Sequence, residues 1–234
     1  MIRVKNLEIK YGKRAALTDV SFEASSSSVL AVMGPNGSGK SSLLKGILGL
    51  VNPSFGEISF LNPSLNRKKI GYMPQSPAFP KNIKLAELLS FFKKLETVEE
   101  SSYLNLLKSL ELEPHMEKKF GSLSGGTKQK VSILQCFSTR KPIYIIDEPT
   151  ASLDPYISNL LKQMILLKKK EGALVIFSTH LLSEVQEIAD RFFLLSEGTI
   201  LIDDTPSSFL HKNRQINLQD ALMNFWNKEY IQKP

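Results

Sequence analysis

The chain has 234 residues, of which 42% are hydrophobic, and carries a formal net charge of +7. This length allows one large domain or two small ones with a substantial core. A single cysteine, Cys136, excludes an intramolecular disulfide and fits a reducing compartment. We expect neither a signal peptide nor a membrane span, because the apolar runs are too short. The positive charge suits nucleic acid or an anionic membrane surface, although a solvated basic surface explains it more simply.

The first part of the chain is predicted to be rich in strands. Alternating apolar side chains over residues 2–9 indicate an edge-type strand, and a turn at Tyr11-Gly12 leads to a second strand. An apolar run then precedes a glycine-rich loop, and a helical pattern follows until Asn52-Pro53 ends it. This order of elements predicts an antiparallel layer beside the loop. The strands are expected at 2–9, 17–24, 29–33, 56–61 and 69–73.

The glycine-rich loop at residues 34–41 fits the pattern G-x-x-x-x-G-K-[ST] between a strand and a helix. Its glycines let successive N–H groups point inward at a polyphosphate, and the following helix adds its unpaired N–H groups. Lys40 is placed to reach the outer phosphates, and the Ser41 hydroxyl to bind Mg²⁺. A turn that merely contains a lysine is the less favoured interpretation. The predicted nucleotide contacts are Gly34, Pro35, Asn36, Gly37, Ser38, Gly39, Lys40, Ser41 and Ser42.

Helical patterns replace strands at residues 83–120. One apolar stripe begins at Leu85 and a second at Tyr103, before Pro114 interrupts the pattern. We interpret this segment as a helical insert. Its aromatic residues are expected to belong to a core rather than to contact a cofactor.

The second half alternates apolar strands with helices, which predicts an α/β fold with a parallel sheet covered on both faces. Strands are expected at 143–146 and 173–177, and helices to about 138, at 155–170 and to about 189. A hairpin around Glu197-Gly198 and helices near Ser207 and at 218–226 follow. We expect one domain over 1–210, with a core at 1–82 and 121–210, the insert at 83–120, and a helical tail at 211–234.

Polar side chains follow the predicted strands at the sheet edge where ligands of open α/β folds collect. Asp147 ends one apolar strand and is predicted to hold Mg²⁺, and Glu148 can orient and polarise an attacking water. His180 ends the next strand and can donate to a γ-phosphate oxygen. Gln75 follows a short strand, and its neutral amide can contact metal or water. Glu148, His180 and Gln75 are therefore the predicted catalytic set, and Ser41, Gln75 and Asp147 the metal set.

A second anion cradle is predicted where Ser124, Gly125 and Gly126 open a later helix with small residues and free N–H groups. Two cradles in one small domain predict a dimer in which each copy closes this cradle on the nucleotide held by the other. Asp154 follows soon after Glu148 and is expected to lie near the same seam and to contact nucleotide.

Over about residues 2–202 the chain resembles the nucleotide-binding subunit of an ATP-binding-cassette (ABC) transporter. In chain order the similar stations are the adenine-stacking aromatic at Tyr11, the Walker A loop at 34–42, the Q-loop glutamine at Gln75, the signature loop at 123–126, Walker B at 143–147 with the catalytic glutamate at Glu148, the D-loop at 152–154 and the switch histidine at His180. The resemblance implies the P-loop NTPase core of an ABC ATPase, with ATP and Mg²⁺ as cofactors. It also implies that two such domains close head to tail around two ATP, with hydrolysis coupled to transport.

Two departures from the family pattern stand out. Thr127 stands where the commonest form of the signature loop has a glutamine. We expect this difference to alter the activity without abolishing it, because the cradle at Ser124 does not use that side chain. Residues 25–28 replace a glycine-containing turn, to which we attach no functional meaning. The context Gly-Thr-Lys-Gln-Lys, the compact insert and the ending at 217–222 are similar to the exporter branch that serves drugs, polysaccharides or copper-site maturation.

The resemblance implies partners as well. One cassette without a membrane span implies a separate multi-spanning membrane permease and a second ABC ATPase subunit, most simply another copy, at the cytoplasmic face of the cell membrane. A soluble ATPase switch acting on nucleic acid or the ribosome is the alternative that the basic charge keeps open. Such relatives generally carry paired cassettes or long inserts, so nucleic acid is not the expected partner. A small-molecule kinase would leave Ser124 and His180 without a role.

Overall fold

The computed structural model describes residues 1–95, 98–150 and 152–231. Its first sheet is antiparallel, with the order β2-β1-β4, and consists of β1 (Ile2–Tyr11), β2 (Arg14–Ala24) and β4 (Phe55–Phe60). The predicted edge position of the first strand is wrong, because β1 pairs with β2 on one side and β4 on the other. Its alternating pattern reports one buried face, and it contains no information on how many neighbours the strand has.

The second sheet has the order β5-β6-β7-β3-β8-β9. At its centre β3 (Ser28–Met33) pairs in parallel with β7 (Leu174–Thr179) and β8 (Arg191–Ser196). The sheet continues through β6 (Ile143–Asp147) to β5 (Ile70–Met73), while β9 (Thr199–Asp204) runs antiparallel to β8. The predicted parallel sheet and terminal hairpin are confirmed. The antiparallel layer takes three of the five early strands, and β3 and β5 join the parallel sheet.

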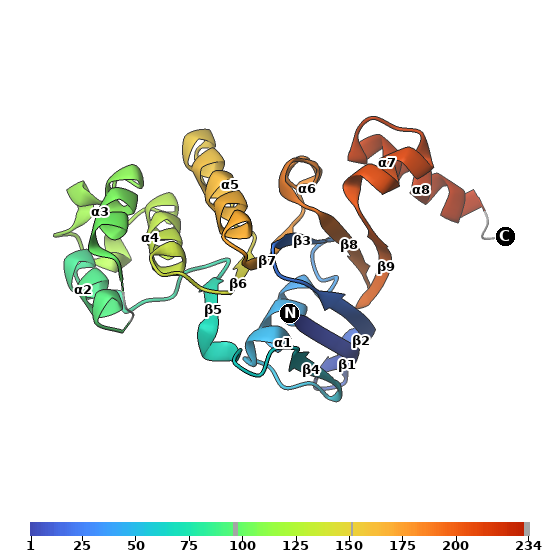
Figure 1. The fold of residues 1–234 in the computed structure, drawn as a ribbon, viewed down its shortest axis with the longest axis horizontal. Helices are drawn as coiled ribbons and strands as arrows, with labels where there is room; N and C mark the ends of the chain where they lie inside the picture. Colours follow the sequence, from blue (N-terminus) through green and yellow to red (C-terminus); the bar gives the residue numbers. More distant parts are fainter. Residues whose placement is uncertain (96–97, 151, 232–234) are drawn as a thin grey trace.

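Helices cover both faces of the parallel sheet (Figure 1). α4 (Gly125–Phe137), α5 (Pro155–Lys170) and α6 (Leu182–Ile188) lie over one face, and α1 (Lys40–Leu48) lies between the other face and the antiparallel sheet. In β3, Val29 and Met33 enter the core under α4, α5 and α6, whereas Leu30 and Val32 enter the core shared with α1 and β1. Both faces of β3 are buried, which explains its continuous apolar sequence.

The remaining helices lie at the two ends of the molecule (Figure 1). α2 (Leu85–Leu95) and α3 (Glu100–Ser109) lie beside α4 at one end, and α7 (Pro206–Asn213) and α8 (Leu218–Ile231) form the other. Short 3-10 helices occur at Arg67–Lys69, Glu113–His115 and Phe120–Ser122. Over the described ranges, each helix is too short or too polar to cross a bilayer.

Candidate active site

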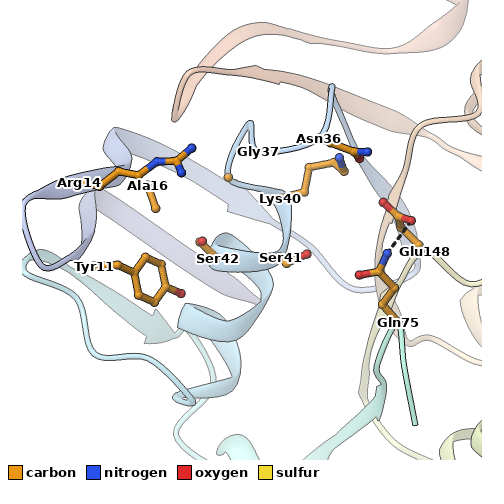
Figure 2. Close-up of a pocket in the computed structure, with 11 residues that line it drawn as sticks. Tyr11, Arg14, Ala16, Asn36, Gly37, Lys40, Ser41, Ser42, Gln75 and Glu148 are labelled. Carbon is orange, nitrogen blue, oxygen red and sulfur yellow. Dashed lines mark hydrogen bonds between the residues drawn. The ribbon is translucent and has the colours of Figure 1, made fainter.

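The carboxyl ends of β6 and β7 are aligned, because these parallel strands place Asp147 opposite Ser178. On the other side of β7, Met33 at the end of β3 lies opposite Thr179. A cavity of about 550 Å³ opens at this edge of the sheet (Figure 2). It is lined by Tyr11, Arg14, Ala16, Asn36, Gly37, Gly39, Lys40, Ser41, Ser42, Gln75 and Glu148.

The loop between β3 and α1 needs glycine at two positions. Gly34 and Gly39 have φ values of 151° and 111°. A Cβ at Gly34 would lie 2.2 Å from the carbonyl oxygen of Leu195, and a Cβ at Gly39 2.6 Å from that of Ala16. No side chain fits at either position, so the loop can follow this path only with glycine. The first turn of α1 contains no acidic residue, which leaves its N–H groups suited to an anion.

Lys40 begins α1 and folds back over this loop. Its Nζ donates to the carbonyl oxygens of Gly34 at 2.8 Å and Pro35 at 3.1 Å. Burial lowers the pKa of Lys40, and the negative charges of Glu148 and Asp147 oppose this effect. Among the described residues the hydrogen-bond partners of this buried ammonium are carbonyl oxygens. It is well placed to bind a phosphate, because a phosphate would add a negative charge in direct contact with it.

Asp147 and Glu148 are organised by Ser178 at the end of the neighbouring strand. The Ser178 Oγ donates to Asp147 Oδ1 at 2.5 Å and accepts from the Glu148 backbone N–H at 2.9 Å. Glu148 has a positive φ of 48°, which is uncommon for a residue other than glycine. Ser41 Oγ donates to the same Asp147 oxygen at 3.3 Å. Sequence reasoning missed Ser178, whose only signal was a polar residue two positions before His180.

The three predicted catalytic residues converge on one carboxylate oxygen. Gln75 Nε2 donates to Glu148 Oε2 at 2.9 Å, and His180 Nδ1 lies 3.8 Å from that oxygen. Tyr11 and Arg14 lie at one end of the cavity and Gln75 and Glu148 at the other, with the phosphate loop between them (Figure 2). The site therefore has an aromatic end and a carboxylate end.

Arg14 and Ala16 line the cavity although the sequence did not single them out. Both lie on β2, which the β1–β2 hairpin brings beside Tyr11 by pairing Tyr11 with Arg14. Pairing across the hairpin, rather than any local motif, places them at the site. An arginine beside an aromatic ring and a phosphate loop adds positive charge at the Tyr11 end.

Seven predicted nucleotide contacts do not line this cavity: Gly34, Pro35 and Ser38 within the phosphate loop, and a set of four residues outside that loop. Ser124 and Asp154 each cap a helix: Ser124 Oγ accepts from the Thr127 N–H at 3.1 Å, and Asp154 Oδ1 accepts from the Ile157 N–H at 2.9 Å. The hydroxyls of Ser124 and Thr127 are hydrogen-bonded at 2.8 Å. Ser124 and Gly125 are exposed. The other two members of the set are Gly125 and Gly126.

The two glycines of this cradle differ in their surroundings. A Cβ at Gly126 would lie 3.0 Å from the carbonyl oxygen of Ser152, so this loop contacts the segment that follows Glu148. Among the residues that the structure describes, a Cβ at Gly125 would meet nothing within 4 Å. None of these residues of its own chain therefore requires glycine at position 125.

The oxygen donors beside the phosphate loop fit a magnesium ion. Ser41 Oγ and Asp147 Oδ1 lie 3.3 Å apart at the first turn of α1. Mg²⁺ prefers oxygen ligands, is usually held by one or two protein side chains, and takes its other ligands from phosphates and water. In the part of the chain that the structure describes, no group of three or more His, Cys, Asp or Glu residues is arranged to hold a metal.

Comparisons with known proteins agree with this geometry. Residues 17–151 match the family described as ABC transporter. The lantibiotic transport ATP-binding protein SrtF of Streptococcus pyogenes is 33% identical over 206 residues, which cover 87% of this chain and 90% of that protein. The solved structure of an ATP-binding subunit of an ABC transporter is 30% identical, with a TM-score of 0.85 over 95% of this chain and 98% of the other. A dimeric post-hydrolysis state of the ATP-binding cassette MJ0796, bound to ADP and Pi, is 27% identical, with a TM-score of 0.75 over 88% of this chain and 98% of the other.

Proposed function

The chain belongs to the ABC transporter family as an ATP-binding subunit, and we propose that it hydrolyses MgATP as a dimer to drive a separate membrane permease. A fold alone does not establish an activity. The observation that supports this one is the meeting of Lys40, Asp147 and Glu148 around the first turn of α1. The alternative of an ATPase that acts on nucleic acid is not favoured, because the relative described above is a transport protein.

ATP lies along the cavity with its base at the Tyr11 end and its phosphates on residues 34–42. The loop N–H groups and the α1 N-terminus bind the β-phosphate region. Lys40 leaves its carbonyl partners and pairs with the outer phosphates. Ser41 and Asp147 hold Mg²⁺, which neutralises charge on the outer phosphates when bound.

Hydrolysis is centred on Glu148. Its carboxylate orients the attacking water and takes a proton from it as the oxygen bonds to the γ-phosphorus, and the bond to the β–γ bridging oxygen breaks. General-base assistance of this kind typically contributes about 10²- to 10⁴-fold. His180 donates to a γ-phosphate oxygen, and Gln75 leaves Glu148 to contact the water or the metal. ADP and phosphate are the products.

The dimer follows from the position of the second cradle. Ser124, Gly125 and Gly126 are presented outside the cavity of their own chain, where they can close on the γ-phosphate held by a second copy. The dimeric cassette described above supports this arrangement. Asp154 lies at the same seam, two residues after Ser152, which Gly126 closely approaches.

The partner and the direction of transport extend this proposal. The ATPase lies at the cytoplasmic face of the cell membrane, and the permease contributes the contacts that select the cargo. Export is supported by the similarity of residues 126–130 to the exporter branch. Co-purification with a multi-spanning membrane protein from detergent extracts tests the first part, and cargo accumulation in inside-out vesicles supplied with ATP tests the direction.

Two variants test the ATPase itself. Glu148→Gln is expected to retain ATP binding and to accumulate as a dimer with MgATP in size-exclusion chromatography. A monomer at every ATP concentration, with hydrolysis unaffected, would contradict both roles. Lys40→Ala is expected to abolish nucleotide binding in a direct titration, whereas Lys45→Ala, on the exposed face of the same helix, should bind normally.

A further inference from the structure

A buried glutamine connects the nucleotide site to the helix that carries the Ser124 cradle. Gln129 lies in α4, and its side chain is 4% exposed. Its Nε2 donates to the backbone carbonyl oxygen of Gln75 at 2.8 Å. The side chain of Gln75 in turn donates to Glu148 Oε2 at 2.9 Å. Gln75 is therefore attached to α4 through its backbone and to Glu148 through its side chain.

The same helix presents the outer cradle. α4 begins at Gly125, and Ser124 caps it by accepting from the Thr127 N–H. Gln129 lies two residues beyond Thr127, within the second turn, and α-helical hydrogen bonds make this segment a stiff unit. A displacement of Gln129 relative to the sheet is consequently a displacement of Ser124.

The orientation of the Gln129 amide is determined by its partner. Only the nitrogen can donate to a carbonyl, so the Oε1 atom must point elsewhere, and it is buried without a hydrogen-bond partner among the described residues. A buried acceptor left unpaired is unfavourable. An apolar side chain of similar size would avoid that cost but could not hold Gln75, so the hydrogen bond to Gln75 is what the glutamine provides.

We propose that Gln129 is a positioning residue that transmits the state of Gln75 in its own chain's nucleotide site to the Ser124 cradle, which acts on the nucleotide of the other copy. This rests on the proposed function. The bond between the Gln75 side chain and Glu148 is the one that breaks when nucleotide and water enter. The bond from Gln129 to the Gln75 backbone persists, and it moves α4 with the loop.

Hydrogen–deuterium exchange of the segment 123–131 tests this coupling in the full-length protein, kept dilute enough to be monomeric. Adding MgATP to the wild type is expected to change exchange in this segment. Gln129→Met should bind ATP within about twofold of the wild-type affinity, since the residue touches no nucleotide, and yet show no change in the segment. In the dimer, the same variant should lose about tenfold in kcat with little effect on KM.

Ser132→Ala is the matched control. Ser132 lies one turn further along α4 and is fully buried, and its hydroxyl has no hydrogen-bond partner, Gln75 included, in the part of the chain that the structure describes. This variant should respond to MgATP as the wild type does. If Gln129→Met does not fold, Gln129→Asn, which is too short to reach Gln75, serves in its place.

The outcomes separate this proposal from the one it rests on. The coupling is overturned if MgATP changes the exchange of residues 123–131 in the Gln129 variant as much as in the wild type. It is also overturned if the wild-type protein binds ATP and the exchange of this segment does not change. A wild type that binds no ATP, or a Glu148→Gln variant that never dimerises, instead overturns the proposed function.

Discussion

Ser178 donates its hydroxyl proton to Asp147, and the same oxygen accepts the backbone N–H of Glu148. One hydroxyl thus contacts both the metal-binding carboxylate and the positive-φ backbone of the adjacent glutamate, whose N–H also donates to the Ser178 carbonyl oxygen at 3.2 Å. Ser178→Ala removes both bonds of the hydroxyl. The loss of one hydrogen bond to a charged group is worth about 1.5 kcal/mol, or roughly tenfold in rate. We expect kcat to fall by that factor with the ATP affinity changed less, measured by steady-state assays and equilibrium titration. An unchanged kcat would exclude this role.

Glu184 joins the segments that follow Glu148 and precede His180. It is 5% exposed and accepts hydrogen bonds from the hydroxyls of Thr150 and Thr179. Glu184→Met leaves both hydroxyls without this acceptor, which should destabilise the protein by about 2 kcal/mol. The corresponding decrease in Tm, roughly 4–8 °C, can be measured by calorimetry. Thr179→Ser keeps the hydroxyl and should unfold close to the wild-type temperature.

Burial lowers the pKa of Lys40, and only the ammonium form pairs with phosphate. As pH rises, the affinity for ATP should therefore begin to fall at a lower pH than it would for a lysine of ordinary pKa. The stability of the free protein should change in the opposite direction. Between the pKa of Lys40 in the folded protein and its pKa in the unfolded chain, the unfolded chain binds more protons. The free energy of unfolding therefore increases as pH rises through this range. Titrations of ATP above pH 8 test the first effect. Lys40→Arg, which stays charged, should bind without this pH dependence.

Tyr103 predicts a second alkaline effect, in α3. Burial raises the pKa of Tyr103 to about 12, and its hydroxyl has no hydrogen-bond partner among the described residues. In the unfolded chain the Tyr103 hydroxyl loses its proton near pH 10, whereas in the folded protein it keeps it to a higher pH. The free energy of unfolding should therefore decrease as pH rises from about 10 towards 12. Urea unfolding at several pH values should show a shallower loss for Tyr103→Phe. This variant should be no less stable at pH 7, because it removes an unpaired polar group.

The two cradle glycines form a matched pair. Gly126→Ala places a Cβ 3.0 Å from the Ser152 carbonyl oxygen, whereas Gly125→Ala meets no atom of the described residues within 4 Å. Gly125→Ala should therefore keep the wild-type Tm. If a second copy's nucleotide docks on this loop, the same variant should lose about tenfold in ATPase activity, since a 1.4 kcal/mol clash is tenfold in rate. Full activity of Gly125→Ala would place the second nucleotide elsewhere.

Local patterns were sufficient to predict the phosphate loop, because glycine spacing, a buried strand and a helix start all lie within residues 29–42. The other contacts of the site depend on the pairing of strands that are distant in the sequence, which local patterns do not reveal. Ser178 contacts Asp147 only because β6 and β7 pair in parallel, and Arg14 reaches the cavity only through the β1 hairpin. The central position of β1 was missed for the same reason. The division into insert and tail, and the roles of the site residues, stay predictions.

The pairing of β3 also has a consequence for protein synthesis. Ser28 at its start lies opposite Leu174, and Leu30 lies opposite Arg191. While the ribosome is still making the intervening segment, the apolar strand that precedes the phosphate loop has neither lateral neighbour, and a chain released early would expose it. Non-local strands of this kind form slowly and aggregate readily. The nascent polypeptide is therefore expected to depend on chaperones until residue 196 has left the exit tunnel, and to acquire nucleotide only afterwards.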